Sequence, residues 1–303
     1  MSTERTNRKF LDPAVIAQLG ALPLLSRKAM LGNVSGKHSS PHRGASVEFA
    51  EYRKYIPGDD LRRLDWRAFG RTERYYIKEF EADTNLRMMM VLDTSGSMNF
   101  GSVGQTKLEY AQKVAAALSY LAVQQGDAVG LTMVAESIVN HIPCRRNPAH
   151  LTALYDLMEL AAPQGETGIL DVLHELAETV RQRTLVIVFS DLFVDTDQLR
   201  ACFEHLRFRK HDVAVFHLLD PEELGFQFQR PTRFLDMEGG TSIFADPIEI
   251  ADRYHAALDG YLSALKQVVL ETAVDYRRIS IDTSYEKEVT NFLIDRAHRR
   301  GSR

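Results

Sequence analysis

The sequence predicts an α/β protein built on a doubly wound, mainly parallel sheet of the Rossmann type, with a smaller β-rich N-terminal module. Two observations lead to this fold class. The runs LRMMMVLD at 86–93 and TLVIVFSD at 184–191 are largely apolar and each ends in an aspartate, as expected of strands buried on both faces of a parallel sheet. Stretches with helical spacing of apolar residues lie between the predicted strands, so strand and helix alternate along the chain.

The other elements of this main region follow in a regular order. Further strands are predicted for AVGLTMV, for SIVNHIP as its pairing partner, for DVAVFHLLD and for RRISID. Helices are predicted over 106–125, 148–162, 167–182, 195–209, about 247–273, and from a Ser284 cap to about His298. A short β segment near 233–246 precedes the long helix. Right-handed crossovers place the carboxyl ends of the parallel strands at one edge, where ligands of such folds bind.

The N-terminal part of the chain is organised differently. Residues 1–31 are predicted to be a helical segment, with a helix over 10–31 that Pro23 should end or kink. Residues 32–84 are predicted to be a β-rich module, because the alternating runs SVEFAEY and RYYIKEF are typical of strands. This module has few large apolar residues, so we expect it to pack on the main domain, residues 85–303, rather than fold alone.

The bulk composition narrows the functional classes. The 303 residues are 45% apolar and 26% charged, which is ordinary globular composition. A net charge of −4 gives no strong field to recruit nucleic acid or an anionic membrane. There are two cysteines, Cys144 and Cys202, and the polar N-terminus has no apolar signal-peptide core. No segment approaches the ~20 apolar residues of a membrane helix, so we expect a cytoplasmic protein.

Three segments with oxygen-bearing side chains should meet at the carboxyl edge of the sheet. They are Asp93-Thr94-Ser95-Gly96-Ser97 after one central strand, Gly165-Glu166-Thr167-Gly168 at a helix start, and Ser190-Asp191 after another central strand. In the D-x-S-x-S spacing, alternate side chains face one point after a sharp turn, which we expect Gly96 to relax. Carboxylates and hydroxyls are hard oxygen donors that suit Mg²⁺ or Mn²⁺.

These motifs resemble the metal-ion-dependent adhesion site of von Willebrand factor A-type domains. Asp93, Ser95 and Ser97 match its first motif, Thr167 its threonine and Asp191 its final aspartate. The upstream stretch SGKHSSPHRGASVEFAEYRKYIPGDDLRRLDWRAFGRTERYYIKEF is similar to the signature of the bacterial "domain of unknown function 58" family, which places such a module before an A-type domain. The resemblance implies a von Willebrand A-like main domain, these five metal ligands, and a MoxR-type AAA+ ATPase as partner.

Simpler structural interpretations exist beside each functional one. Asp93, Ser95 and Ser97 also suit a strand-end turn with an Asx cap, and Thr167 suits a helix N-cap, a role compatible with ligation. The pair His38 and His42 lacks further zinc ligands, and Pro41 disfavours a helix there. The cluster Arg62–Arg67 around the only tryptophan is interpreted as a structural ion-pair network, with a docking surface as the alternative.

Known catalytic motifs do not fit the region after the first strand. The segment Gly96–Gly101 is followed by Ser102 where a phosphate loop needs lysine, and no G-x-S-x-G elbow is present. A phosphoaspartate phosphatase would need an aspartate where Ser95 stands. We therefore predict a non-enzymatic protein. The family resemblance implies a protein-binding adaptor or chaperone-like subunit, whose bound Mg²⁺ or Mn²⁺ contacts an acidic residue of a MoxR-type ATPase or its client. The alternatives are a metal-dependent hydrolase and a scaffold with a vestigial metal site.

Overall fold

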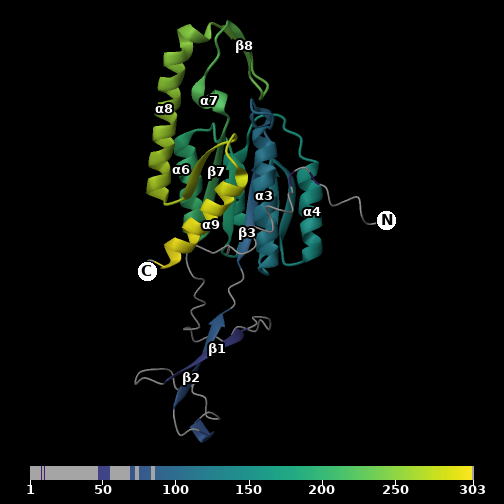
Figure 1. Ribbon diagram of the computed structural model, residues 1–303, viewed down its shortest axis with the longest axis vertical. Coiled ribbons are helices and arrows are strands. Elements are labelled where there is room, and N and C mark those ends of the chain that lie inside the picture. The colour runs from purple at the N-terminus through teal and green to yellow at the C-terminus, as the bar shows by residue number, and fades with distance from the viewer. Residues whose placement is uncertain are drawn as a thin grey trace, which may run out of the picture. The chain divides into compact units, whose positions relative to one another are not determined.

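The computed structural model of the protein describes Arg8, Phe10 and residues 47–54, 69–71, 75–82 and 86–301. The chain divides into two compact units, Met1–Arg27 with Leu86–Arg303, and Lys28–Asn85 (Figure 1). Apart from Phe10, the helix predicted over 10–31 lies outside the described residues. The pair His38 and His42 and the Arg62–Arg67 cluster also lie outside them.

The described part of Lys28–Asn85 contains a two-stranded antiparallel hairpin. Strand β1 (Val47–Lys54) pairs with β2 (Tyr76–Ala82), with an irregularity in register between Phe49 and Glu51. Both strands fall on the alternating runs that the sequence predicts to be extended. A β-bulge of this kind strengthens the local twist of a hairpin.

The larger unit is built on a six-stranded sheet in the order β10-β7-β6-β3-β4-β5. Its strands are β3 (Arg87–Asp93), β4 (Ala128–Val134), β5 (Ile138–Arg145), β6 (Leu185–Ser190), β7 (Asp212–Leu219) and β10 (Asp275–Ser280). All neighbouring strands are parallel except β4 and β5, which pair as predicted and are antiparallel. The mainly parallel α/β fold class is therefore confirmed.

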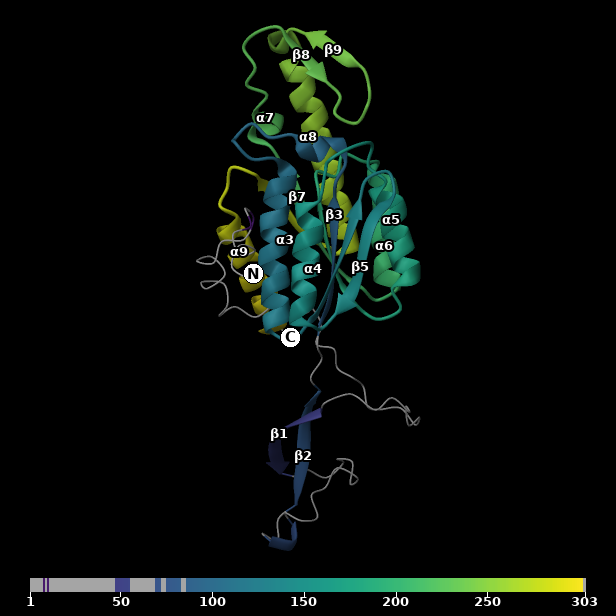
Figure 2. The ribbon, with the colours of Figure 1, turned by 90° about the vertical axis from the view of Figure 1, so that its right-hand side faces the viewer.

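Helices cover both faces of this sheet (Figure 2). One face packs against α3 (Lys107–Gln124), α4 (Pro148–Glu159) and α9 (Tyr285–Gly301). The other packs against α5 (Ile169–Thr179), α6 (Thr196–Phe208) and α8 (Pro247–Thr272). Along β3, Met90 and Leu92 enter the first core and Val91 enters the second, because successive side chains of a strand point to opposite faces. No described helix is long and apolar enough to cross a membrane.

Three short elements lie near the carboxyl ends of the parallel strands. They are the 3₁₀ turn η2 (Gly96–Asn99), helix α7 (Pro221–Gly225), and the hairpin of β8 (Thr232–Leu235) and β9 (Ser242–Ala245). In Figure 2, α7 and the hairpin stand beyond the sheet, beside the upper part of α8. The hairpin corresponds to the short β segment predicted near 233–246. The sequence-based prediction did not include η2 or α7.

The strand order places a topological switch point between β3 and β6. From β3 the chain continues to β4 on one side, whereas β6 and β7 lie on the other side. The connections after β3 and β6 therefore diverge and leave a crevice between the two strand ends, where doubly wound sheets bind ligands.

Candidate functional site at the carboxyl edge of the sheet

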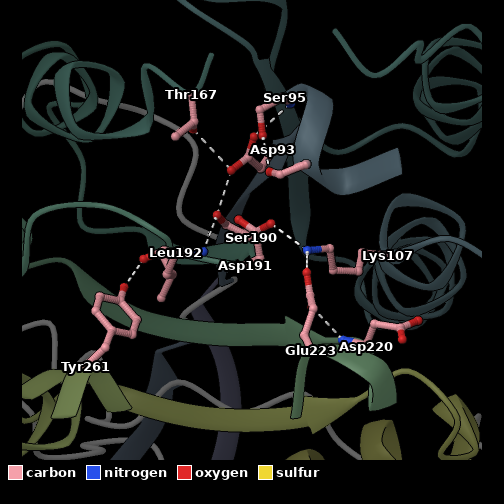
Figure 3. Close-up of polar contacts among 11 residues, drawn as sticks. Asp93, Ser95, Lys107, Thr167, Ser190, Asp191, Leu192, Asp220, Glu223 and Tyr261 are labelled. Atoms are coloured by element: carbon pink, nitrogen blue, oxygen red, sulfur yellow. Dashed lines mark hydrogen bonds and ion pairs between the residues drawn. The ribbon is translucent and has the colours of Figure 1, made fainter. Parts of the chain in front are cut away.

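The switch point gathers the oxygen donors that the sequence singles out (Figure 3). Asp93 is the last residue of β3, and Ser190 and Asp191 end and follow β6. Asp93, Ser95, Ser190 and Asp191 are all buried, and Ser97 is partly exposed. Thr167, also partly exposed, comes from the loop before α5.

Asp93 is the centre of this hydroxyl-rich cluster. Its Oδ2 accepts hydrogen bonds from Ser190 Oγ at 2.6 Å and from Thr167 Oγ1 at 3.2 Å. Its Oδ1 accepts one from the backbone N–H of Ser95 at 2.9 Å. The hydroxyls of Ser95 and Ser97 lie 3.1 Å apart. Four of the five predicted site residues thus converge on one point, and Ser190, which the predicted ligand set omits, joins them.

Backbone hydrogen bonds hold the two loops of the cluster together. The N–H of Gly96 donates to the carbonyl of Gly165 at 2.9 Å, and the N–H of Gln164 donates to the carbonyl of Thr94 at 2.9 Å. The N–H of Thr94 in turn donates to Val134, at the end of β4. These bonds fix the position of Thr167 relative to the D-x-S-x-S turn, although 74 residues separate it from Asp93.

Gly96 is required for a different reason from the one expected. It is not among the described glycines with positive φ, so the turn itself does not demand glycine. A Cβ atom at this position would lie 1.9 Å from the carbonyl oxygen of Met237, in the turn between β8 and β9. The β8–β9 hairpin therefore rests directly on the backbone of the D-x-S-x-S turn, and only glycine allows so close an approach.

The carboxyl group of Asp93 is electrostatically unfavourable as an anion. Burial, followed by the nearby charge of Asp191, raises its pKa from 3.8 to about 6, although the hydrogen bonds from Ser190 and Ser95 act in the opposite direction. In the described part of the chain, the polar partners of this carboxylate are hydroxyls and one amide, and no ion pair reaches it. A buried carboxylate without a cationic partner is an unusual feature of a folded protein.

Asp191 is paired differently, with a lysine that the sequence does not single out. Lys107, at the start of α3, is fully buried, and its Nζ lies 2.7 Å from Asp191 Oδ2 and 2.6 Å from Glu223 Oε1 of α7. Although burial opposes the charge of the ammonium group, these two carboxylates raise the pKa of Lys107. Asp191 therefore stands beside the cluster with one oxygen engaged by an internal cation.

A buried histidine and tyrosine lie next to the site on the neighbouring strands. His217, in β7, is fully buried, and its Nδ1 lies 2.7 Å from the hydroxyl of Tyr276 in β10. Burial lowers the pKa of His217 to about 4, so this imidazole is neutral at pH 7. The ring has no access to solvent, which a general base acting on a substrate there would need.

The donor set fits a hard divalent cation rather than a soft one. No group of three or more His, Cys, Asp or Glu suited to a metal is present in the described residues. Any cation held here would rely on two carboxylates, Asp93 and Asp191, and on the hydroxyls of Ser95, Ser97 and Thr167. Oxygen ligands of this kind suit Mg²⁺ and Mn²⁺.

The fold and this site define an α/β protein with a hydroxyl–carboxylate cluster at the switch point of its sheet. The chain belongs to the DUF58 family: a family model described as "Protein of unknown function DUF58" matches residues 51–257. The family resemblance seen in the sequence is thereby confirmed.

Relatives and solved structures of similar sequence or fold are known. The chain is 26% identical over 296 residues to the "uncharacterized protein Rv1480" of Mycobacterium tuberculosis and to the "uncharacterized protein Mb1516" of Mycobacterium bovis, covering 96% of this chain and 92% of each relative. Similar solved structures include the conserved hypothetical protein BatB from Bacteroides thetaiotaomicron, with a TM-score of 0.46, 18% identity, and coverage of 71% of this chain and 100% of that one. They also include the SpRpn10 VWA domain, with a TM-score of 0.42, 12% identity, and coverage of 69% and 95%.

Proposed function

We propose that this protein is a divalent-cation-dependent protein-binding module. Asp93, Ser95, Ser97, Thr167 and Asp191 would hold Mg²⁺ or Mn²⁺, and the bound cation would offer an open coordination position to an acidic side chain of a partner. The residues of the chain position the donors, exclude water from the buried side of the site, and set its charge.

The single observation that supports this proposal most strongly is the state of Asp93. Its carboxyl group is fully buried, its pKa is raised to about 6, and the three donors that bond to it from the described part of the chain are uncharged. A purely structural carboxylate at a strand end is expected to be paired or exposed. A carboxylate that binds a cation reversibly is expected to be buried and to have no cationic side chain as a partner, as is the case for Asp93.

The charge balance of the site agrees with a divalent ion. The site holds three carboxylates, those of Asp93, Asp191 and Glu223, and one ammonium group, that of Lys107, which pairs with Asp191 and Glu223. When all four are ionised, their net charge is −2. A divalent cation would neutralise this charge, whereas a monovalent one would leave half of it. Lys107 thereby limits the charge of the site without occupying the hydroxyl cluster around Asp93.

We assign no catalytic step to this site. His217 is neutral and fully buried, and the polar groups around Asp93 are hydroxyls that already donate to it or pair with each other. A hydrolase would need a base or a nucleophile within reach of its substrate. Binding, rather than turnover, is the role that the geometry supports best.

The partner we propose is a MoxR-type AAA+ ATPase or its client, as the family resemblance implies. To test this, the full chain would be titrated calorimetrically with a MoxR-type ATPase from the same organism, in Mg²⁺ and in EDTA. Binding should require Mg²⁺ and should weaken in Thr167→Ala, which removes one hydroxyl, but not in Thr152→Ala, an exposed threonine on α4.

Two results would contradict the proposal. Equal affinity in Mg²⁺ and in EDTA, with the fold confirmed by circular dichroism, would mean that any partner docks elsewhere. Multiple turnover of ester or phosphoester substrates in Mg²⁺ or Mn²⁺, lost in Thr167→Ala but not in Thr152→Ala, would show that the site belongs to a hydrolase.

A further inference from the structure

A cavity of about 390 Å³ adjoins the proposed cation site. Ser97 of η2 lines it, together with residues of α7, of the turn between β8 and β9, and of α8. Its volume lies within the range of small-ligand and side-chain pockets. Because Ser97 Oγ is also 3.1 Å from Ser95 Oγ, the cavity and the hydroxyl cluster share a wall.

Aromatic rings form much of this cavity. Phe226 stacks on Tyr254 with ring centroids 4.3 Å apart and on Phe234 with centroids 5.6 Å apart. Phe228 meets Phe234 edge to face, with centroids 5.3 Å apart and planes at 90°. All four rings line the cavity, and Phe100 and Phe193 line it as well. Such a group of rings offers both apolar surface and the electron-rich faces that attract cations.

The backbone of Phe226 is strained to place its ring in this group. Phe226 ends α7 with φ of 45°, in the left-handed region that favours glycine. This conformation is unfavourable for an L-residue because its Cβ atom lies too close to the following carbonyl oxygen. A large aromatic residue at a position where glycine would be easier indicates that the ring itself contributes to the structure or function of the cavity.

The charged residues that line the cavity are all acidic. They are Glu222, Glu223, Asp236 and Glu238, and no lysine, arginine or histidine is among the described lining residues. The ammonium group of Lys107 pairs with Glu223 at 2.6 Å. The other three carboxylates that line the cavity have no such ion pair with Lys107. Aromatic walls with carboxylates among them are complementary to a cation that also has flat apolar surface.

We propose that this aromatic–acidic pocket binds an arginine side chain of the partner segment whose carboxylate reaches the cation site. This inference rests on the proposed function and defines the partner further. A guanidinium group is planar, stacks on aromatic faces and pairs with carboxylates through two N–H donors, whereas the compact lysine ammonium group does not stack. Since the two sites share Ser97, the arginine and the acidic residue lie close together in one short segment.

The test uses short fluorescent peptides with one arginine and one aspartate separated by zero to four glycines. In Mg²⁺ at least one spacing should bind the full chain about tenfold more tightly than the same peptide with citrulline, the neutral isostere, or leucine in place of arginine. The double substitution Asp236→Asn with Glu238→Gln should remove this preference. Glu175→Gln with Asp259→Asn, which removes two exposed charges outside the cavity, should retain it.

The outcomes separate the two proposals. If arginine and citrulline peptides bind equally while binding still needs both the aspartate and Mg²⁺, the arginine pocket is refuted and the cation site stands. If leucine binds as well as arginine, the cavity is an apolar dock and the inference is wrong. If the arginine preference persists while neither Mg²⁺ nor the aspartate matters, the pocket stands and the proposed function fails.

Discussion

The buried charge of Asp93 leads to a prediction about stability in the absence of metal. Its pKa rises from 3.8 to about 6 on folding, which corresponds to about 3 kcal/mol, at about 1.4 kcal/mol for each tenfold change. Because the pKa is raised, the protonated form of Asp93 makes the folded state more stable than the ionised form would. This added stability is fully present below pH 3.8 and is lost as the pH rises through about 6. In EDTA, Asp93→Asn should therefore be more stable than wild type above pH 6, by up to about 3 kcal/mol.

Urea unfolding of both proteins in EDTA, followed by circular dichroism from pH 4 to 8, measures this difference. The two stabilities should converge toward pH 4 and separate between pH 4 and 6. Adding Mg²⁺ at pH 7.5 should reverse the order, because a ligand at ~1,000 times its dissociation constant adds roughly 4.1 kcal/mol to the protein that binds it. Equal stability of the two proteins at every pH in EDTA would refute the idea that Asp93 is an uncompensated buried anion.

Three further substitutions probe the surroundings of the site. Lys107→Met should lower the free energy of unfolding by about 3–5 kcal/mol in EDTA, because two carboxylates lose their buried partner. Mg²⁺ should raise the Tm of this variant more than that of wild type, and a Tm equal to that of wild type in EDTA would contradict this. Gly96→Ala should lower the free energy of unfolding by about 1–3 kcal/mol and lessen the Mg²⁺-dependent rise in Tm, since its Cβ meets the Met237 carbonyl. The control Gly260→Ala, which has open space around it on α8, should stabilise the fold by up to about 1 kcal/mol. Similar effects of the two glycine substitutions on urea unfolding would rule out the hairpin contact. Phe226→Gly should be about 1 kcal/mol more stable to urea than Phe226→Ala, because the backbone is left-handed there; the opposite order would show that it is not.

The sheet and its edge could be predicted because their signals are local. The run Met88–Leu92 is apolar at every position and is buried at every position, as a strand covered on both faces must be. The aspartates that end such strands necessarily reach the carboxyl edge. The sequence therefore places Asp93 and Asp191 at this edge, where the structure has them. The alternate spacing of Ser95 and Ser97 in the D-x-S-x-S turn brings their hydroxyls to the same place.

The ion pairs and the cavity could not be predicted, because they depend on contacts between distant segments. Lys107, at the start of a helix, has the sequence character of a surface lysine, yet it is buried against residues 84 and 116 positions away. Gly96 owes its role to a backbone contact with Met237 that no local pattern signals. Helix α7 did have a signal: Asp220 caps it, Pro221 follows, and Glu223 completes a capping box.

The central claim is that the cluster around Asp93 binds a divalent cation, and Mn²⁺ tests it most directly. Electron paramagnetic resonance of free Mn²⁺, titrated into the full chain, counts bound ions without a partner. We predict one site in wild type, its loss in Asp93→Ala, weakening in Thr167→Ala, and competition by Mg²⁺. Binding that is absent in wild type, or equal in wild type and Asp93→Ala, would contradict the claim.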